Sequence, residues 1–116
     1  LFSSGSDQLE TAGKAQLAQL ASTLQEIAKD IPEKLNWILR VDGHTDRVPI
    51  HNLKFASNWE LSTGRAISVV KFLQEQSIPA NRLAAAGFGE HQPLDARDDE
   101  IAYRRNRRIE LKLDQR

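Results

Sequence analysis

Two stretches with a helical repeat of apolar residues, each closed by an isoleucine–proline pair, constrain the fold of this chain more than any other feature. In both stretches apolar residues recur every three or four positions, which predicts amphipathic helices from about Ala12 to about Asp30 and from about Trp59 to Gln76. The pairs Ile31-Pro32 and Ile78-Pro79 end these helices, because the residue before a proline is disfavoured in the helical conformation. The apolar positions are Leu17, Leu20, Ala21, Leu24, Ile27 and Ala28 in the first helix and Ala66, Val69, Val70 and Leu73 in the second.

Runs with the twofold period of β-strands separate and follow these helices. Trp37 to Thr45 carries apolar residues on one face and mostly polar residues on the other, and Arg82 to Gly87 is a short run of small residues. Ile109 to Leu113 alternates apolar with charged residues, and a short helix is expected before it, from Asp99 to Arg105. Leu1-Phe2 is interpreted as the tail of a preceding strand. This order predicts an α/β (α+β) fold, a two-layer sandwich with two main helices packed on one face of a small mixed β-sheet.

Length and composition limit the class of protein. A chain of 116 residues is expected to form a single domain over residues 1–116. Sixteen basic residues balance sixteen acidic ones, which argues against a general nucleic-acid or membrane-surface binder. The sequence has no cysteine, which excludes disulfide scaffolds and thiolate metal sites, and no run near the roughly 20 apolar residues of a membrane span. Because the chain begins at Leu1 rather than methionine, we expect a fragment of a longer protein that carries any membrane anchor.

Asp46 and Arg65 are the residues best placed to bind a ligand. Asp46 ends the run Gly43-His44-Thr45-Asp46 at the end of a predicted strand, and Arg65 lies near the first or second turn of the following helix. Ligands usually bind beyond the carboxyl ends of strands, and helix starts add N–H donors there. A carboxylate beside a guanidinium suits a zwitterion, with the carboxylate taking an ammonium and the guanidinium taking a carboxylate. The residues alone leave a more common alternative open, in which Asp46 and Arg65 pair with each other or Asp46 caps a turn.

Other kinds of site have weaker support in the sequence. Metal binding by Asp46 with the scattered histidines is one, and no metal or cofactor is expected. A nucleic-acid patch formed by the arginines between Arg104 and Arg108 is another, but few aromatic residues lie nearby for base stacking. Trp37 and Trp59 are expected to provide core or pocket-wall packing rather than sugar stacking. The histidines considered as ligands are His44, His51 and His91.

Hydrolysis of a wall glycan is the main enzymatic alternative. Asp46 with Glu60 or Glu90 would supply the acid–base pair. No spacing specifies such a pair, and Ser62 has no histidine–acid relay in the sequence. A non-catalytic domain is therefore expected.

Four ordered blocks of residues resemble a known family. The pattern is similar to the C-terminal domains of the OmpA/MotB family, and Phe2-x-x-Gly5-Ser6-x-x-Leu9 resembles the first segment of that family. The segments from Val48 to Ile50 and from Phe55 to Ser62 most resemble the flagellar-stator, MotB-like branch. The blocks are Gly43-His44-Thr45-Asp46, Asn58-x-x-Leu61-Ser62-x-x-Arg65-Ala66, Gly87-x-Gly89-Glu90-x-x-Pro93 and Asn106-Arg107-Arg108-Ile109-Glu110.

The resemblance implies a βαβαβ arrangement and non-covalent binding of peptidoglycan through the diaminopimelate of the stem peptide. Asp46 would hold the ammonium of the ligand and Arg65 its neighbouring carboxylate. Four further positions are implied to line or shape the pocket, and Arg108 is a weaker candidate for contact with the wall. These four positions are Thr45, Asn58, Leu61 and Ser62.

The resemblance also implies a cellular setting. It predicts a periplasmic domain of a protein anchored in the inner or outer membrane, with a MotB-like motor stator as first interpretation and an OmpA- or Pal-type outer-membrane anchor as the alternative. A membrane tether and a stator partner would belong to the missing N-terminal part, and a homodimer would raise retention at the wall through effective concentration. The loop from Arg47 to Ser57 is expected to set this chain apart from its relatives.

Overall fold

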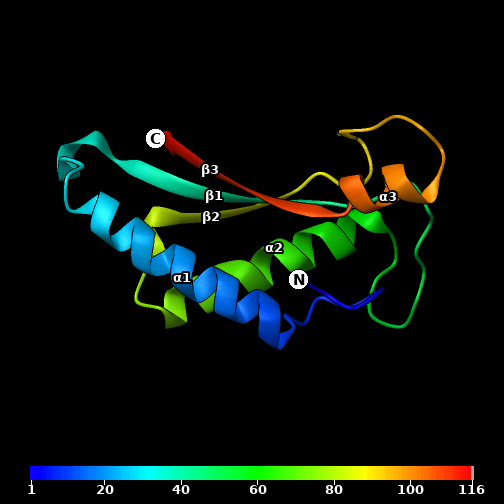
Figure 1. The fold of residues 1–116 in the computed structure, drawn as a ribbon, viewed down its shortest axis with the longest axis horizontal. Helices are drawn as coiled ribbons and strands as arrows, with labels where there is room; N and C mark the ends of the chain where they lie inside the picture. Colours follow the sequence, from blue (N-terminus) through cyan, green and yellow to red (C-terminus); the bar gives the residue numbers. More distant parts are fainter. Residues whose placement is uncertain (116) are drawn as a thin grey trace.

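The computed structural model describes residues 1–115, which form alternating helices and strands (Figure 1). The order is the predicted one, and the observed bounds differ from the predicted ones by one or two residues. The β1–α2–β2–α3–β3 series, preceded by α1, confirms the implied βαβαβ arrangement. The elements are α1 (Thr11–Ala28), η1 (Glu33–Leu35), β1 (Trp37–His44), α2 (Asn58–Glu75), η2 (Ala80–Arg82), β2 (Leu83–Gly87), α3 (Glu100–Asn106) and β3 (Arg108–Gln115).

The sheet is mixed, with strand order β2-β1-β3. Strand β1 lies in the centre, parallel to β2 and antiparallel to β3. Gly43 pairs with Gly87 on one side, and His44 pairs with Arg108 on the other. The carboxyl ends of β1 and β2 and the start of β3 therefore meet at one edge of the sheet.

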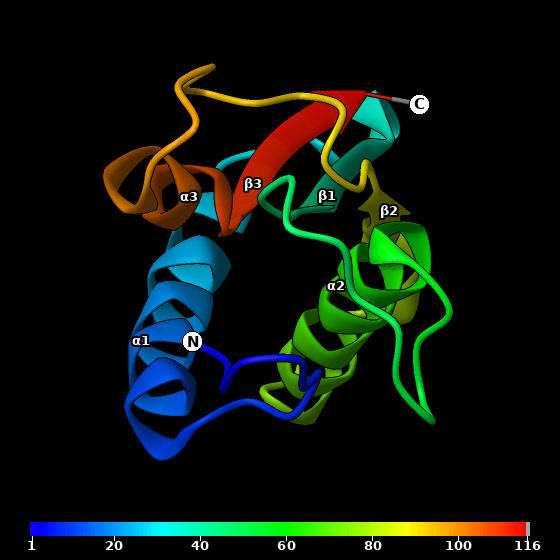
Figure 2. The same ribbon diagram turned by 90° about the vertical axis from the view of Figure 1, so that its right-hand side faces the viewer.

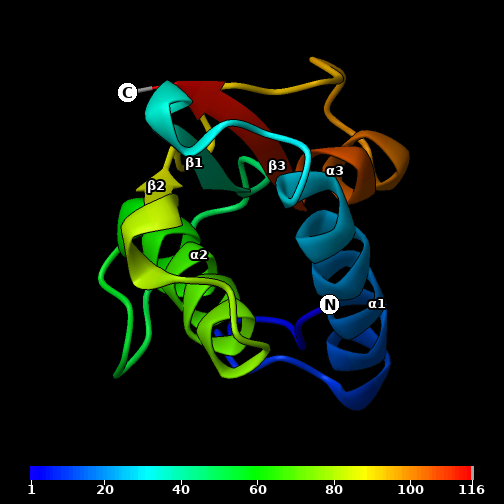
Figure 3. The same cartoon turned by 90° about the vertical axis from the view of Figure 1, so that its left-hand side faces the viewer.

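Helices α1 and α2 cover one face of the sheet, which gives the predicted two-layer sandwich (Figures 2 and 3). The core lies between these layers, because the apolar side chains of both helices and of β1 face each other there. Its buried members are Leu17, Ala21, Trp37, Leu39, Val41, Ala66, Val69, Leu73 and Ile78. The opposite face carries ion pairs, including a bidentate contact from Arg40 to the fully buried Asp42.

Helix α2 touches the sheet at two glycines. A methyl group added at Gly43 would collide with the backbone carbonyl oxygen of Ser62, and one added at Gly87 would collide with Thr63. Only glycine permits this approach, so the first turns of α2 rest directly on the carboxyl ends of β1 and β2. This contact fixes the helix start beside Asp46.

One expectation about the chain ends needs correction, and one strand is buried only in part. Leu1-Phe2 does not continue the sheet, since Phe2 forms only an isolated antiparallel bridge with Leu9. In β3 the apolar alternation is buried only in part, and Leu113 remains 53% exposed. The reason is that Ile109 and Leu111 pack against the core, whereas Leu113 lies in the exposed second half of the strand. Within residues 1–115, no helix has the length and apolar character needed to cross a membrane.

Candidate functional site

A cavity of about 710 Å³ lies where the strand ends meet the start of α2. Five segments form its walls: the N-terminal segment, the end of β1 with its following loop, α2, α3 and the start of β3. Six of the seven predicted binding residues line it, namely Thr45, Asp46, Asn58, Leu61, Arg65 and Arg108. The fold therefore brings together side chains that are far apart in the sequence.

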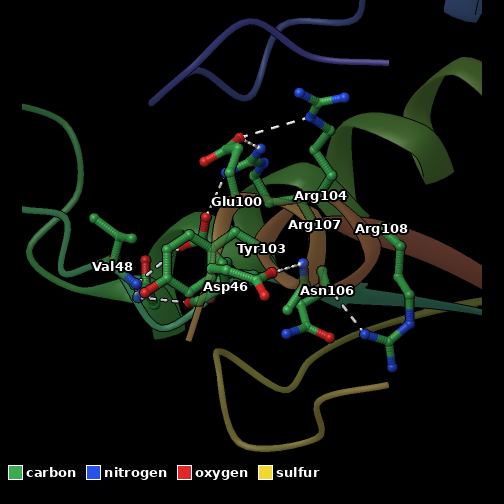
Figure 4. Close-up of polar contacts among 12 residues, drawn as sticks. Asp46, Val48, Glu100, Tyr103, Arg104, Asn106, Arg107 and Arg108 are labelled. Carbon is green, nitrogen blue, oxygen red and sulfur yellow. Dashed lines mark hydrogen bonds and ion pairs between the residues drawn. The ribbon is translucent and has the colours of Figure 1, made fainter. Parts of the chain in front are cut away.

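Asp46 is held at the back of this cavity with 8% of its surface exposed. Its Oδ1 accepts the backbone N–H of Val48 at 3.0 Å, and its Oδ2 accepts a hydrogen bond from Arg107 Nη1 at 2.6 Å (Figure 4). The backbone carbonyl of Asp46 accepts hydrogen bonds from Thr45 Oγ1 at 2.9 Å and from Asn58 Nδ2 at 3.3 Å. Both carboxylate oxygens and the backbone carbonyl of Asp46 therefore have donors, which fixes the orientation of this residue.

Arg65 lies about two turns into α2 and is also 8% exposed. Its Nε donates to the carbonyl oxygen of Ser6 at 2.8 Å and its Nη2 to that of Ser3 at 3.1 Å. The guanidinium also stacks over the ring of Phe2, 5.1 Å from its centroid. Burial lowers the pKa of Arg65, while the charge of Asp46 acts in the opposite direction.

Asp46 and Arg65 do not neutralise each other directly. Across residues 1–115, no ion pair within 4.0 Å joins these two residues or gives Arg65 any carboxylate partner. Carbonyl oxygens hold the Arg65 guanidinium in place without cancelling its charge. A buried cation without an anion is costly, so this arrangement favours an anionic ligand group in the cavity. The Asp46–Arg65 pair of the alternative interpretation does not form within residues 1–115, but its other half does, because the Asp46 side chain accepts the Val48 N–H and so caps a turn.

Arg107 and Glu100 belong to the cavity but were not predicted as site residues. Arg107 bridges Asp46 and Glu100, with Nη2 at 2.7 Å from Glu100 Oε1. The hydrogen bond to Glu100 is the main cause that raises the pKa of Arg107, and the same bond lowers the pKa of Glu100. The available signal in the sequence was the arginine pair Arg107-Arg108, and the pairing of His44 with Arg108 shows why Arg107 comes close to the end of β1.

Arg108, the weaker candidate, is committed elsewhere although it lines the cavity. Its Nε donates to Glu110, its Nη1 to the carbonyl of Asn106 at 3.2 Å and its Nη2 to the carbonyl of Gln92 at 2.9 Å. All three nitrogen atoms therefore have acceptors within the fold. Arg107, the preceding residue, carries the direct contact with Asp46.

Asn58 and Ser62 hold the backbone segments around the cavity in place through hydrogen bonds. The Asn58 amide lies within hydrogen-bond distance of three oxygens, those of the Asp46 and Val48 carbonyls and of the Glu90 carboxylate, at 3.3, 3.1 and 3.3 Å. The Ser62 hydroxyl accepts from Gly89 N–H at 3.0 Å and does not line the cavity. Ser62 thus shapes the site by fixing the turn after β2.

The alternative sites do not assemble in the described part of the chain. Among residues 1–115, no group of three or more histidine and carboxylate side chains is placed to hold a metal ion. His44 stacks on Phe88 with ring centroids 5.0 Å apart, and burial, followed by the charge of Arg108, lowers its pKa. Trp59 is 51% exposed and stacks on His91, so the expectation that it packs in the core or pocket wall is wrong.

The carboxylates considered for hydrolysis also have other roles. Glu60 accepts a hydrogen bond from the Ser57 hydroxyl at 2.7 Å, where Ser57 caps α2. Glu90 accepts one from the Asn58 amide at 3.3 Å. Neither residue lines the cavity that contains Asp46.

Comparisons with known proteins give a consistent set of relatives. The OmpA family pattern matches residues 1–107. The uncharacterised protein YtxE of Bacillus subtilis is 32% identical over 112 residues, covering 96% of this chain and 43% of that protein. Motility protein B of the same organism is 38% identical over 72 residues, covering 61% of this chain and 28% of that protein.

A MotB-like protein from Desulfovibrio vulgaris has the same fold, with a TM-score of 0.86 and 29% identity over all of this chain and 68% of that one. The chain thus spans less than half the length of these two curated relatives.

Proposed function

The chain belongs to the OmpA family, and from this we propose that it is a non-catalytic domain that binds peptidoglycan non-covalently through the diaminopimelate of the stem peptide. Diaminopimelate carries an ammonium and a carboxylate on the carbon at the end of its side chain. A site for this group needs one anion and one cation on facing walls. Asp46, in the loop after β1, and Arg65, in α2, line the same cavity and provide these charges.

The observation that carries this proposal is the state of Arg65. Its guanidinium is buried, fixed by two backbone carbonyls and without a carboxylate partner among residues 1–115. Its Nε and Nη2 atoms make these two bonds and Nη1 makes neither of them, so Arg65 keeps N–H donors for a ligand carboxylate. Because the side chain is already ordered, binding would cost little conformational entropy.

The same contacts favour binding over catalysis. The Asp46 carboxylate accepts hydrogen bonds from the Val48 N–H and from Arg107, so both of its oxygens already have donors within the fold. Glu100 is the other acidic residue of the cavity, and it is bound to Arg107 as well. Both acidic side chains of the cavity are therefore already engaged in ion pairs with Arg107.

The cellular role follows as part of this proposal. Residues 1–116 would form the wall-binding domain of a longer, membrane-anchored protein in the periplasm. The similarity to motility protein B favours a stator-type parent over an outer-membrane anchor. Tethering to the membrane, or pairing into a homodimer, would raise the effective concentration of the domain at the wall.

Amide NMR during titration with a diaminopimelate-containing muropeptide tests the proposed site. We expect the largest shift changes at Thr45, Asp46, Asn58 and Arg65, because these residues meet the ligand or hold those that do. A matched muropeptide with lysine in place of diaminopimelate is the control. It keeps the ammonium but lacks the carboxylate for Arg65, so we expect binding at least about tenfold weaker. Equal binding of both peptides, or shifts confined to other surfaces, would refute the assignment.

Release of soluble fragments from purified sacculi tests the non-catalytic part separately. We expect none above the level of a buffer control. Time-dependent release that Asp46→Asn abolishes would instead support a hydrolase.

A further inference from the structure

The cationic group of the proposed ligand faces a cavity wall with two carboxylates rather than one. Asp46 comes from the end of β1 and Glu100 from the first turn of α3, and Arg107 lies between them (Figure 4). The two nitrogen–oxygen distances are 2.6 Å to Asp46 Oδ2 and 2.7 Å to Glu100 Oε1. Arg107 thus binds Asp46 through Nη1 and Glu100 through Nη2.

We propose that Arg107 is an internal counter-ion that occupies the position of the ligand ammonium, and that Glu100 retains Arg107 when the ligand displaces it from Asp46. This inference rests on the proposed function and extends it. Ligand binding then becomes an exchange of cations at Asp46. The ammonium takes Asp46 Oδ2, and Arg107 keeps its second arm on Glu100.

The contacts of Asp46 show why an exchange is needed. Its Oδ1 accepts the backbone N–H of Val48 and its Oδ2 accepts Arg107, so a ligand ammonium has to compete with Arg107 for the charge of Asp46. The Asp46 side chain is only 10% exposed, which leaves little room for a second cation beside Arg107. A neutralised carboxylate also attracts an ammonium more weakly than a bare one.

The exposure of Arg107 and Glu100 makes the movement feasible. The side chains of Arg107 and Glu100 are 38% and 60% exposed, so both can reorient without opening the core. Arg104 also approaches Glu100, at 3.8 Å, and keeps this carboxylate in a cationic environment. Glu100 therefore lowers the cost of moving Arg107 away from Asp46.

Affinity measurements on three variants test the exchange. We would titrate the muropeptide into wild type, Arg107→Gln, Glu100→Gln and the double variant by calorimetry at one fixed ionic strength. Arg107→Gln should bind about three- to tenfold more tightly, because the competing cation is gone. Glu100→Gln should bind about three- to tenfold more weakly, because Arg107 then stays on Asp46. In the Arg107→Gln background, the Glu100→Gln change should shift affinity by less than about twofold.

Arg105, in α3, provides a matched control for Arg107, which directly follows this helix. Arg105 pairs with Asp95 at 3.2 Å and does not line the cavity, so Arg105→Gln should leave affinity unchanged. If Arg107→Gln binds as well as or less tightly than wild type, Arg107 is a positioning residue for Asp46 and the exchange is refuted. If wild type itself does not bind the muropeptide, the proposed function fails first, and the two failures are thus distinguishable.

NMR of the Arg107 guanidinium in the wild-type protein gives a second readout that needs no variant to fold. Ligand addition should change the signals of its side-chain N–H groups as the bond to Asp46 is lost. Saturation with ligand while these signals stay unchanged would overturn the inference.

Discussion

Arg65 joins the ligand site to the fold at the scale of a single residue. It donates to the carbonyl oxygens of Ser3 and Ser6, and its guanidinium covers Phe2. The residue therefore fixes the N-terminal segment, which forms one wall of the cavity. The proposed binding role of Arg65 is therefore coupled to the stability of the fold.

Substitution of Arg65 should reveal that coupling. Arg65→Gln removes two hydrogen bonds from a buried side chain, and we expect the free energy of unfolding to fall by about 1–3 kcal/mol. Lys71→Gln, on the exposed side of the same helix, should change it by less than about 0.5 kcal/mol. Urea denaturation measures both. An unchanged Arg65→Gln midpoint would show that the N-terminal segment is held in another way.

Asp95 gives a prediction about acid stability. Hydrogen bonds from the Arg97 side chain and backbone lower the pKa of Asp95 from 3.8 to about 2. Because the pKa is lower in the folded state, the stabilisation is present above the unfolded value near 3.8 and is lost as pH falls towards about 2. Asp95→Asn should therefore lose less stability than wild type between these pH values, in thermal melts over that range. Asp30→Asn, at an exposed turn, serves as the control, and identical slopes for Asp95→Asn and wild type would contradict the account.

The sequence led to most of the candidate residues but not to their pairing. Asp46 and Arg65 stand out because a strand end and a helix start bring opposite charges to one edge of the sheet. Glu100 and Arg107 were missed because their contacts depend on the position of α3, which no periodicity specifies. The exposure of Trp59 was also missed, since its place in the first turn of α2 does not tell which way the side chain faces.

At the scale of elements, the contact between α2 and β1 positions the site. Gly43 lies against the backbone of Ser62 in α2. This close contact holds α2, which carries Asn58 and Arg65, next to the strand end that precedes Asp46. A side chain at Gly43 would have to push the helix away from the sheet. Backbone atoms cannot yield as a flexible side chain does.

Gly43→Ala should therefore be among the most damaging small changes. We expect a loss of about 3 kcal/mol in the free energy of unfolding, because the new methyl group meets backbone rather than side-chain atoms. Gly64→Ala is the matched control, since its methyl group would meet the side chains of Phe55 and Asp7 at 3.1 and 3.2 Å. There the gain in helix propensity, about 0.5–1 kcal/mol, should offset the adjustment. Similar losses for both variants would show that the helix–sheet contact is not the cause.

The elements themselves were largely predictable from the chain. Both long helices have strong periodicity and clear proline stops, and β1 has the twofold period of a strand, so their positions follow from local physics. The incomplete burial of β3 was not predictable, because burial of a strand depends on which helix lies below it. The same holds for Leu1-Phe2, because Phe2 lies under the Arg65 guanidinium and Leu1 lies against Gly13 instead of extending the sheet.

At the scale of the whole molecule, the fold gathers five separate segments around one cavity of mixed charge. The chain has no net charge, yet its cavity holds a buried guanidinium and a bridged pair of carboxylates. Helices α1 and α2 support the cavity because both pack on β1 through the hydrophobic core. A preorganised site of this kind gives specificity at modest affinity, which membrane tethering would then reinforce.

Retention on purified sacculi tests the central claim most directly. Wild type, Asp46→Asn, Arg65→Lys and the control Lys71→Gln would be sedimented with sacculi that contain diaminopimelate, after circular dichroism has shown that each is folded. We predict that wild type and Lys71→Gln sediment alike, while Asp46→Asn and Arg65→Lys are retained at least about tenfold less. Folded Asp46→Asn and Arg65→Lys proteins that sediment as well as wild type would contradict the account.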